Sequence, residues 1–261
     1  MPNIKAVVFD WAGTTIDFGS FAPMGVFIKA FDSFGVTVTI DQARAPMGAP
    51  KWDHIRALMD MSEISDQWQA KYGQPPSNED VTRVYDVFVP MNEQVAAEYA
   101  DLVPGCKKAV DALRAKGIKI GSTTGYTRSI MEHVLPVAAA QGYVPDNLVC
   151  SDDLAEGRPG PLGMYKCMVD LAVYPPEAVV KVDDTAPGIL EGVAAGCITV
   201  GVALSGNAVG KTPNELAKMP VTELEVLRTQ ATDLLRAAGA DFVIDTVADL
   251  PCLIEEIEAE P

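Results

Sequence analysis

The chain has 261 residues, of which 48% are hydrophobic and 21% charged, and its formal net charge is −16. This length accommodates one sizeable core, or a core domain with a smaller inserted domain. A protein this acidic repels polyphosphate backbones, so the composition disfavours general binding of nucleic acid. It does not exclude a small anionic substrate, because a pocket can be positive within an acidic protein.

The cysteines and the apolar runs indicate the compartment. The five cysteines are dispersed and include no C-x-x-C pair, a pattern typical of reduced thiols in the cytoplasm. The first ten residues lack the long apolar stretch of a secretion signal. No run reaches the roughly 18 apolar residues that span a bilayer. We therefore expect a cytoplasmic protein that does not bind membranes.

Short apolar runs recur along the chain, and each ends close to a polar residue. We expect six of them to be strands: IKAVVFD, GIKIGSTTG, NLVCSDD, AVVKVDD, ITVGVAL and DFVID. Helical segments lie between them, such as residues 105–117, which place Val110 and Leu113 on one face and end at Gly117. This alternation predicts an α/β fold with a parallel, doubly wound sheet. Such sheets bind ligands at the carboxyl ends of their strands.

Residues 17–99 interrupt this alternation with helical periodicity and no convincing strand. Aromatic residues at helical spacing indicate a buried helix face, and a capping pair marks a further helix start. These residues are Phe27, Phe31 and Phe34, then Ser77 and Asp80. We therefore predict an all-helical domain over residues 17–99, inserted into a core formed by residues 1–16 and 100–261.

Polar side chains suited to catalysis follow the predicted strands. In chain order they are Asp10, Thr124, Arg158, Asp183 and Asp184. Each alone has an ordinary explanation as a turn former, a helix cap or a solvated charge. Together they match the needs of phosphoryl transfer. A carboxylate attacks phosphorus, a hydroxyl and a cation neutralise its oxygens, and two carboxylates hold Mg²⁺.

The loop after Asp10 suits an anion. The backbone amides of Ala12, Gly13 and Thr14 can cradle a phosphate group, and Gly13 allows close approach. Enzymes that form an aspartyl phosphate usually carry a second carboxylate two residues after the first, which protonates the leaving group. Ala12 occupies that position here. Either the site is impaired or its reaction needs no acid there.

Several segments of the chain carry a family resemblance. FDWAGTT, STTGYT, GRP and KVDDT resemble the signature segments of the haloacid-dehalogenase superfamily. Within it, DQARAPMGAPKWDHIRAL and KIGSTTGYTR resemble the phosphonoacetaldehyde hydrolase (phosphonatase) family, and the resemblance covers nearly the whole chain. It implies a Rossmann-like core with a helical cap inserted after the first strand. It also implies Asp10 as nucleophile, Mg²⁺ bound by Asp10, the Ala12 carbonyl and Asp184, Thr124 on the phosphoryl group, and Arg158 balancing charge.

The fourth signature segment departs from the family pattern, which often reads G-D-T-x-x-D. Asp183 stands where the pattern has glycine, and Gly188 stands where it has the later aspartate. The metal shell implied by the family therefore does not transfer in every detail. One hypothesis is that Asp183 supplies the missing outer-shell carboxylate.

The inserted domain offers a second reactive group. Pro50 suits the first turn of a helix, which would place Lys51 and His54 on one face. A neutral lysine condenses with an aldehyde to give an imine, and burial lowers the pKa of a lysine. The resemblance implies phosphonoacetaldehyde as substrate, an imine on Lys51, proton transfers assisted by His54, attack by Asp10, and release of acetaldehyde and phosphate. The expected pocket walls are Met47, Gly48 and Tyr126.

Three alternatives stay open: a Mg²⁺-dependent phosphatase of small phosphate esters, a dehalogenase, and a non-catalytic binding protein. Ala12 speaks against the phosphatase, because an alkoxide leaving group requires a general acid. The acidic pair and the lysine have no purpose in a dehalogenase. The resemblance also implies a homodimer formed through the cap, to which Phe21, Phe27 and Phe31 would contribute.

Overall fold

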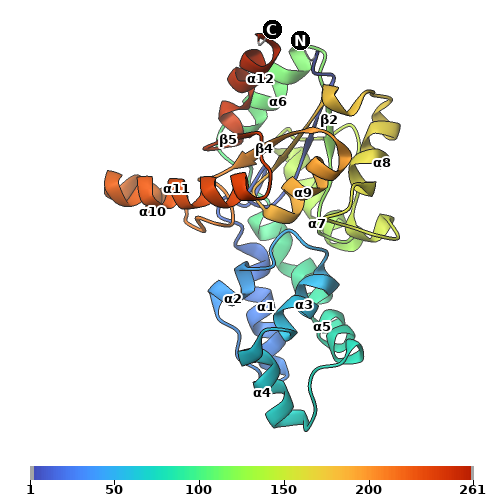
Figure 1. Cartoon of the computed structure of the whole chain (residues 1–261), viewed down its shortest axis with the longest axis vertical. Coiled ribbons are helices and arrows are strands. Elements are labelled where there is room, and N and C mark those ends of the chain that lie inside the picture. Colours follow the sequence, from blue (N-terminus) through green and yellow to red (C-terminus); the bar gives the residue numbers. More distant parts are fainter. Residues whose placement is uncertain (1–2, 260–261) are drawn as a thin grey trace.

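The protein is described by a computed structural model that covers residues 3–259. It consists of a core built around a parallel sheet and a helical cap that follows the first strand (Figure 1). This arrangement confirms the predicted fold class, a Rossmann-like α/β core with an inserted helical cap. The cap helices lie between the predicted domain limits at residues 17 and 99, which remain a prediction.

Five parallel strands form the sheet, in the order β2-β1-β3-β4-β5. Their bounds are β1 Ala6–Phe9, β2 Lys119–Ser122, β3 Val179–Asp183, β4 Ile198–Val202 and β5 Phe242–Ile244. The order reverses at β1, because β2 pairs with one side of it and β3 with the other. A crevice forms at such a switch point, beyond the carboxyl ends of the strands. The residues after β1, β2 and β3 therefore meet there.

One of the six predicted strands is wrong. The segment NLVCSDD makes a single bridge, between Val149 and Thr123, and then enters a 3-10 helix over Ser151–Asp153. The Asp153 carboxylate accepts a hydrogen bond from the Cys150 amide at 2.8 Å, which turns the chain away from the sheet. A local side-chain acceptor thus ends the pairing that the apolar run suggested.

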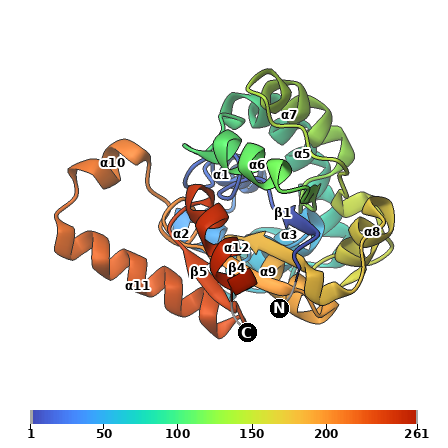
Figure 2. The same ribbon diagram turned by 90° about the horizontal axis from the view of Figure 1, so that it is seen from above.

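Helices cover both faces of the sheet (Figure 2). Strand side chains alternate between faces, so Val7 and Phe9 pack in one hydrophobic cluster and Ala6 and Val8 in another. The first face is covered by α6 Cys106–Ala115, α7 Arg128–Ala140 and α12 Leu250–Ala259. The second is covered by α8 Leu162–Leu171, α9 Ala186–Ala195 and α11 Val221–Ala237, which follows the short α10 Pro213–Lys218. Burial on both faces explains why β1 is apolar at every position.

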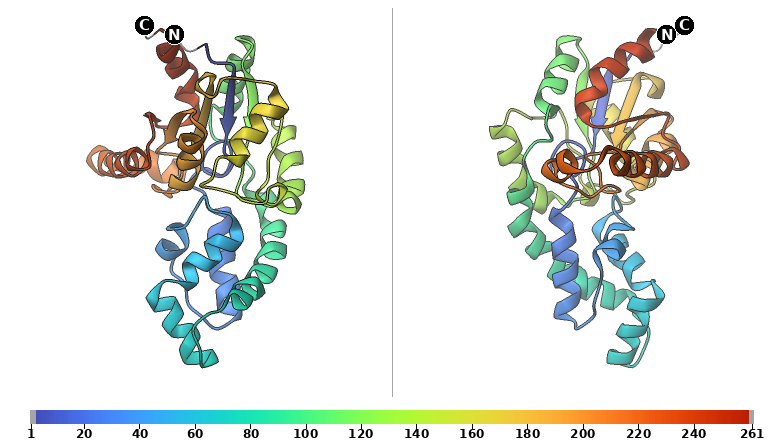
Figure 3. Two further views of the ribbon diagram at one scale, coloured as in Figure 1. Left: turned by 45° about the vertical axis from the view of Figure 1, so that its right-hand side comes forward. Right: turned by 90° about the vertical axis from the view of Figure 1, so that its left-hand side faces the viewer.

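The cap lies beyond the carboxyl ends of the strands (Figure 3). Its helices are α1 Ala22–Ser33, α2 Ile40–Arg44, α3 Lys51–Met59, α4 Ser62–Tyr72 and α5 Asn78–Ala96. They enclose an apolar core of their own that includes Phe27, Phe31 and Trp68. As predicted, Ser77 and Asp80 form a capping box at the start of α5. Helix α5 leads the chain back to the core, and it packs against the core helix α7.

Two of the three aromatic residues predicted at a dimer interface lie inside the cap instead. Phe27 and Phe31 are fully buried inside the cap of the same chain. Phe21 is half-buried, and the guanidinium of Arg44 lies 5.2 Å from its ring centroid. Phe27 and Phe31 cannot reach a partner, because helical spacing here places them in the cap's own core. Within residues 3–259, none of the helices has the length and apolar character that crossing a bilayer requires.

Candidate active site

Asp10 directly follows β1, at the carboxyl edge of the sheet. Its backbone N–H donates to the carbonyl of Val182 at 2.9 Å, so the sheet ladder fixes its position. Its buried carboxylate forms an ion pair with Arg158 at 2.9 Å. Burial, followed by the charge of Asp183, raises the pKa of Asp10 to about 6, and the nearby cations oppose the rise. Asp10 is therefore mostly ionised at neutral pH, as a nucleophile must be.

The loop after Asp10 closes tightly against Asp184. Gly13 has a φ of +84°, and a Cβ there would lie 2.7 Å from Cγ of Asp184, so glycine is required. The Thr14 hydroxyl donates to Asp184 at 3.1 Å. The amides of Gly13 and Thr14 donate inside the loop, to the carbonyls of Ile16 and Trp11. Gly13 and Thr14, predicted as part of a phosphate cradle, here shape the loop and support Asp184.

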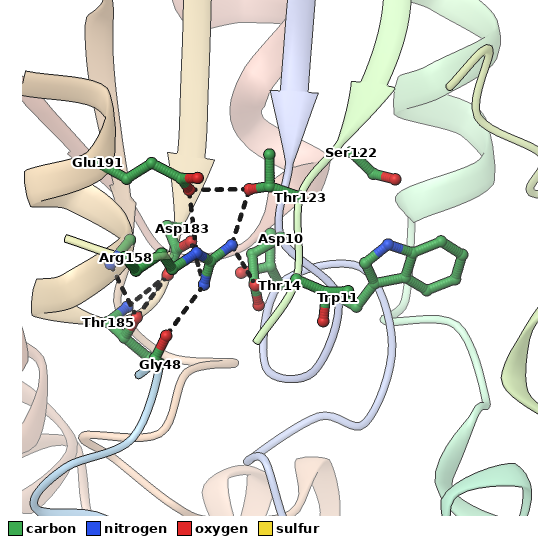
Figure 4. A network of polar contacts seen from close by, with 12 residues as sticks. Asp10, Trp11, Thr14, Gly48, Ser122, Thr123, Arg158, Asp183, Thr185 and Glu191 are labelled. Atoms are coloured by element: carbon green, nitrogen blue, oxygen red, sulfur yellow. Dashed lines mark hydrogen bonds and ion pairs between the residues drawn. The ribbon is translucent and has the colours of Figure 1, made fainter. Parts of the chain in front are cut away.

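Two buried cations, Arg158 and Lys181, lower the pKa of Asp10, and Figure 4 shows Arg158 beside its carboxylate. Arg158 pairs with Asp10 at 2.9 Å, Asp183 at 3.3 Å and Glu191 at 2.9 Å. The Nζ atom of Lys181 lies 3.1 Å from both Asp183 and Glu191. Lys181 reaches the site from β3, and Glu191 from α9. These partners hold the guanidinium of Arg158 in one orientation toward Asp10.

Thr123 completes this network (Figure 4). Its hydroxyl accepts from Lys181 at 2.6 Å and from Arg158 at 2.8 Å, and it donates to Glu191 at 2.9 Å. A hydroxyl offers one donor and two acceptor positions, so all of its capacity is used. The next residue is Thr124, the predicted ligand of the phosphoryl group, which lines a small cavity between the core and the cap. Its hydroxyl accepts from the amide of Tyr126 at 3.1 Å, which fixes its direction.

Asp184 is buried without a cation partner. Its two oxygens accept from the Thr14 hydroxyl at 3.1 Å and from the Asn207 amide at 2.7 Å. Among residues 3–259, no lysine or arginine forms an ion pair with it within 4.0 Å. Burial, with the charges of Asp10 and Asp183, holds its pKa well above the usual value. Oxygen atoms of these three aspartates lie within 4.8 Å of one another, a spacing that fits one metal ion.

Asp183 occupies the space that a side chain at position 188 would need. A Cβ added to Gly188 would overlap the Asp183 carboxylate. That carboxylate accepts from the amide and hydroxyl of Thr185, at 3.0 and 2.7 Å. Burial alone would raise the pKa of Asp183, but Arg158 and Lys181 outweigh it and hold the pKa below the usual value. In this conformation, therefore, the Asp183 carboxylate and a side chain at position 188 exclude each other.

Lys51 is the first residue of α3 and enters the site from the cap. Its side chain is buried, and Nζ lies 5.1 Å from the ring centroid of Tyr126 and 5.8 Å from that of Phe27. Burial lowers the pKa of Lys51 to about 8, and the attraction of Asp10 only partly offsets this effect. The positive end of the α3 dipole also disfavours a charged amine there. Lys51 is thus an amine with an accessible neutral form.

His54 lies one turn further along α3, inside the cap core. Its ring stacks on Phe27 with centroids 3.9 Å apart, and Nε2 lies 2.9 Å from the carbonyl of Ala43. Burial and the charge of Lys51 lower its pKa well below the usual value, so the ring is neutral. Nε2 must then carry the proton and donate to Ala43. That tautomer leaves Nδ1 as a buried acceptor without a partner among the described residues.

The core and cap residues meet at a cavity of about 20 Å³. One water molecule needs roughly 10–15 Å³, so the cavity has room for one or two waters. Of the predicted residues, Gly13, Thr14, His54 and Asp184 do not line it. Those that do are Asp10, Ala12, Met47, Gly48, Lys51, Thr124, Tyr126 and Arg158, together with Ser20, Pro23, Gly125 and Thr185. A Cβ on Gly125 would lie 3.0 Å from the Ala49 carbonyl, which shows how closely the cap approaches.

Several site residues were not predicted from the sequence. Lys181 interrupts the apolar strand AVVKVDD, and Glu191 interrupts the apolar helix GILEGVAAG. A charge in a buried run is a signal for a paired ion, because such residues are rarely buried alone. Arg44 and Asn207, which join the cap to the core near Asp184, carry no such signal.

The sheet, the strand-end carboxylates and the inserted cap define the class of the protein. Residues 4–196 match the family model described as haloacid dehalogenase-like hydrolase. At 16% identity, the crystal structure of a hydrolase from Pseudomonas syringae shares this fold, with a TM-score of 0.71 over 97% of this chain and 99% of that one.

Closer relatives resolve the family further. A phosphonoacetaldehyde hydrolase from Paraburkholderia phytofirmans is 50% identical, covering 99% of this chain and 97% of that protein. One from Klebsiella pneumoniae is 45% identical at the same coverages. The crystal structure of a phosphonoacetaldehyde hydrolase-like protein from Oleispira antarctica is 42% identical, with a TM-score of 0.96 over 98% of this chain and 92% of that one. The chain belongs to the phosphonoacetaldehyde hydrolase family of haloacid dehalogenase-like hydrolases.

Proposed function

We propose that the protein hydrolyses the carbon–phosphorus bond of phosphonoacetaldehyde to acetaldehyde and phosphate. The observation that carries this proposal is a buried amine from the cap, Lys51, in the same cavity as the carboxylate of Asp10. Hydrolysis of a phosphate ester has no use for such an amine. The names of relatives at 45% and 50% identity support the same substrate.

Lys51 prepares the substrate. With a pKa of about 8, part of the amine is neutral near pH 7 and able to attack a carbonyl. Attack on the aldehyde carbon and loss of one water give an imine, which is protonated on nitrogen. The iminium carbon is adjacent to the carbon that carries phosphorus. It can therefore accept the electron pair of the carbon–phosphorus bond.

Asp10 then carries out the phosphoryl transfer. One carboxylate oxygen attacks phosphorus while the carbon–phosphorus bond breaks and its electron pair forms an enamine on Lys51. Protonation of the enamine carbon and hydrolysis by one water release acetaldehyde and free the amine. A second water hydrolyses the aspartyl phosphate and releases phosphate. One water was released at the start, so each turnover consumes one water.

Ala12 suits this chemistry. An alkoxide leaving group would need a proton as the bond to phosphorus breaks, and a carboxylate at position 12 could supply it. The enamine needs no such proton in that step, because the iminium of Lys51 accepts the electron pair. The small side chain of Ala12, which lines the cavity beside Asp10, also leaves room for the substrate carbon.

A divalent metal ion fits the acidic end of the site. Four buried carboxylates gather there, and Asp184 is the one among them that forms no ion pair with a cation of the described residues; the carboxylates are Asp10, Asp183, Asp184 and Glu191. We infer that Asp10, the Ala12 carbonyl and Asp184 hold Mg²⁺, with Asp183 behind them. When bound, such an ion neutralises phosphoryl oxygens and withdraws charge from phosphorus.

The remaining residues bind the phosphoryl group and move protons. Arg158 and the Thr124 hydroxyl face its oxygens, and Gly13 and Thr14 hold the loop in position for it. His54 assists proton transfer to and from Lys51 through its free Nδ1, because Nε2 is committed to the Ala43 carbonyl. Met47, Gly48 and Tyr126 form walls that keep bulk water from the imine.

The deciding experiment is a coupled assay of acetaldehyde release from phosphonoacetaldehyde, with Mg²⁺ present or removed by a chelator. We expect turnover with the metal and almost none without it. A panel of phosphate monoesters run in parallel should give negligible rates, and fast hydrolysis of the esters would favour the phosphatase instead. Borohydride added with acetaldehyde should attach an ethyl group to Lys51, located by peptide mass spectrometry.

Assembly, domain limits and location complete the proposal. We infer that residues 17–99 form the cap, and that two chains form a homodimer through it. The exposed cap residues Ile40 and Tyr72 offer apolar surface for that contact. Light scattering coupled to size-exclusion chromatography measures the mass of the assembly. Unpaired cysteines favour a cytoplasmic location.

A further inference from the structure

The cap and the core are joined beside the metal-binding end of the site by one arginine and one asparagine. We propose that Arg44 and Asn207 are positioning residues that hold the cap closed and connect its closure to Asp184. Arg44 is the last residue of α2 in the cap, and Asn207 lies in the core loop after β4. This inference rests on the proposed function, since closure is what brings Lys51 to Asp10.

One nitrogen of Arg44 connects the cap to two other segments of the chain. Its Nη1 donates to the Gly19 carbonyl at 2.9 Å, to the Asn207 carbonyl at 3.2 Å and to Asn207 Oδ1 at 3.0 Å. Gly19 belongs to the segment between β1 and the cap, while Asn207 belongs to the core. A charged donor shared among three acceptors on two segments resists their separation.

Asn207 completes the connection in both directions. Its side-chain amide donates at 3.1 Å to the carbonyl of Arg44, which also accepts from the Met47 amide at 3.1 Å. Its backbone N–H donates to Asp184 at 2.7 Å. Asn207 therefore contacts the cap through its side chain and the metal-binding carboxylate through its main chain. When the cap opens, the loop loses the contact that holds this amide against Asp184.

The surroundings of Arg44 are shaped for a guanidinium. Its Cζ lies 5.2 Å from the ring centroid of Phe21. Gly210 has a φ of +57°, and a Cβ there would lie 2.7 Å from the same Cζ. A side chain at position 210 would therefore displace the guanidinium. We call the site formed by Gly19, Phe21, Asn207 and Gly210 the Arg44 socket.

The Arg44 socket and Lys51 flank the same short segment. Residues 45–50 run from Arg44 to the start of α3 and carry Met47 and Gly48 into the cavity. Met47 also lines a second cavity of about 360 Å³, which borders Arg44, Asn207 and Asp184. Fixing Arg44 thus fixes one end of the segment whose other end carries the reactive amine. Both the amine and Asp184 take their catalytic positions in the same closing movement.

The test compares Asn207→Ala and Arg44→Met with Arg56→Met. The first retains the backbone N–H on Asp184, and the second retains the packing on Phe21. Arg56 is a cap arginine outside the site, paired with Asp60 at 2.7 Å, and serves as the matched control. We expect each socket variant to lower kcat/KM about tenfold, since a hydrogen bond to a charged donor is worth about that factor. Their effects should be less than additive in the double variant.

Hydrogen exchange and borohydride labelling separate the possible outcomes. Amide hydrogens in peptides over residues 44–50 and 203–210 should exchange faster than in the wild type in both socket variants. Their exchange rates should not change in Arg56→Met. Labelling of Lys51 by acetaldehyde should persist in the socket variants, because the amine moves with the cap. Wild-type exchange together with wild-type kcat/KM in both variants would overturn the proposal. Wild-type protein that neither labels nor turns over substrate would refute the proposed function instead, and the exchange measurement would still test the socket.

Discussion

The cap side and the core side of the cavity each contribute one buried lysine, and the two differ in their partners. Lys181 in the core is 0% exposed and lies 3.1 Å from both Asp183 and Glu191. Lys51 in the cap is 3% exposed, and no ion pair within residues 3–259 includes it. Burial is nearly the same for both. Partners therefore decide whether a buried lysine serves as a fixed charge or as a nucleophile.

The largest expected effect comes from replacing the cap lysine while keeping its charge. Lys51→Arg cannot form an imine, so the carbon–phosphorus bond loses its electron sink. We expect kcat for phosphonoacetaldehyde to fall by about 10⁴-fold or more, as when other covalent nucleophiles are removed. The acetaldehyde-coupled assay measures this loss, with circular dichroism as the control for folding. Full turnover by the variant would contradict the imine mechanism.

The free energy of unfolding should depend more on the core lysine, Lys181, than on the cap lysine, Lys51. Lys181→Met leaves Asp183 and Glu191 to share the charge of Arg158 with Asp10, so the free energy of unfolding should fall by about 3–5 kcal/mol. Lys51→Met removes a buried amine that has no acidic partner, and should change it by less than about 1 kcal/mol or increase it. Urea denaturation monitored by fluorescence gives both values. Equal losses of stability in the two variants would contradict the claim that acidic partners distinguish Lys181 from Lys51.

Asp183, an ion-pair partner of Lys181, allows a test in which its carboxylate is moved to position 188. Asp183→Gly removes the carboxylate behind the metal ligands and should weaken Mn²⁺ binding about 10- to 100-fold, as other outer-shell changes do. Gly188→Asp alone introduces a side chain that overlaps Asp183. Asp183→Gly combined with Gly188→Asp should recover affinity, because the carboxylate returns to nearly the same place. Titration of Mn²⁺ followed by electron paramagnetic resonance measures each constant, and a double variant no better than Asp183→Gly would refute the exchange.

The smallest expected effect is the pH dependence of the cap lysine. With a pKa of about 8, Lys51 is neutral in a fraction that rises about tenfold between pH 7 and pH 9. The rate of borohydride-trapped labelling by acetaldehyde should rise by the same factor. Above pH 8 the unfolded chain retains a proton that folded Lys51 has lost, up to the unfolded pKa of about 10.4. This group's contribution to stability therefore increases with pH in that window. A labelling rate that is flat over this range would contradict the lowered pKa.

The sequence predicted what short patterns encode, and it did not predict what depends on packing. Apolar runs that end in an acid located β1 and β3, because such strands are buried on both faces. Lys51 was identified by its family resemblance, whereas its lack of an acidic partner became visible only in the structure. The run NLVCSDD has the pattern of a strand but does not form one, because Asp153 accepts the backbone N–H of Cys150 in competition with strand pairing. Arg44 and Asn207 are 163 positions apart, and nothing local marks them as neighbours.

The cavity of about 20 Å³ is small for a reaction that consumes water and releases two products. With room for one or two waters, this cavity is smaller than the substrate and products that must pass through it. We therefore expect aldehyde entry and product departure to require movement of the cap. Solvent viscosity would then slow turnover even if every chemical step were fast, because opening moves a whole helical lobe through the medium. If substrate can enter only when the cap moves, the rate of that movement is an upper limit on kcat.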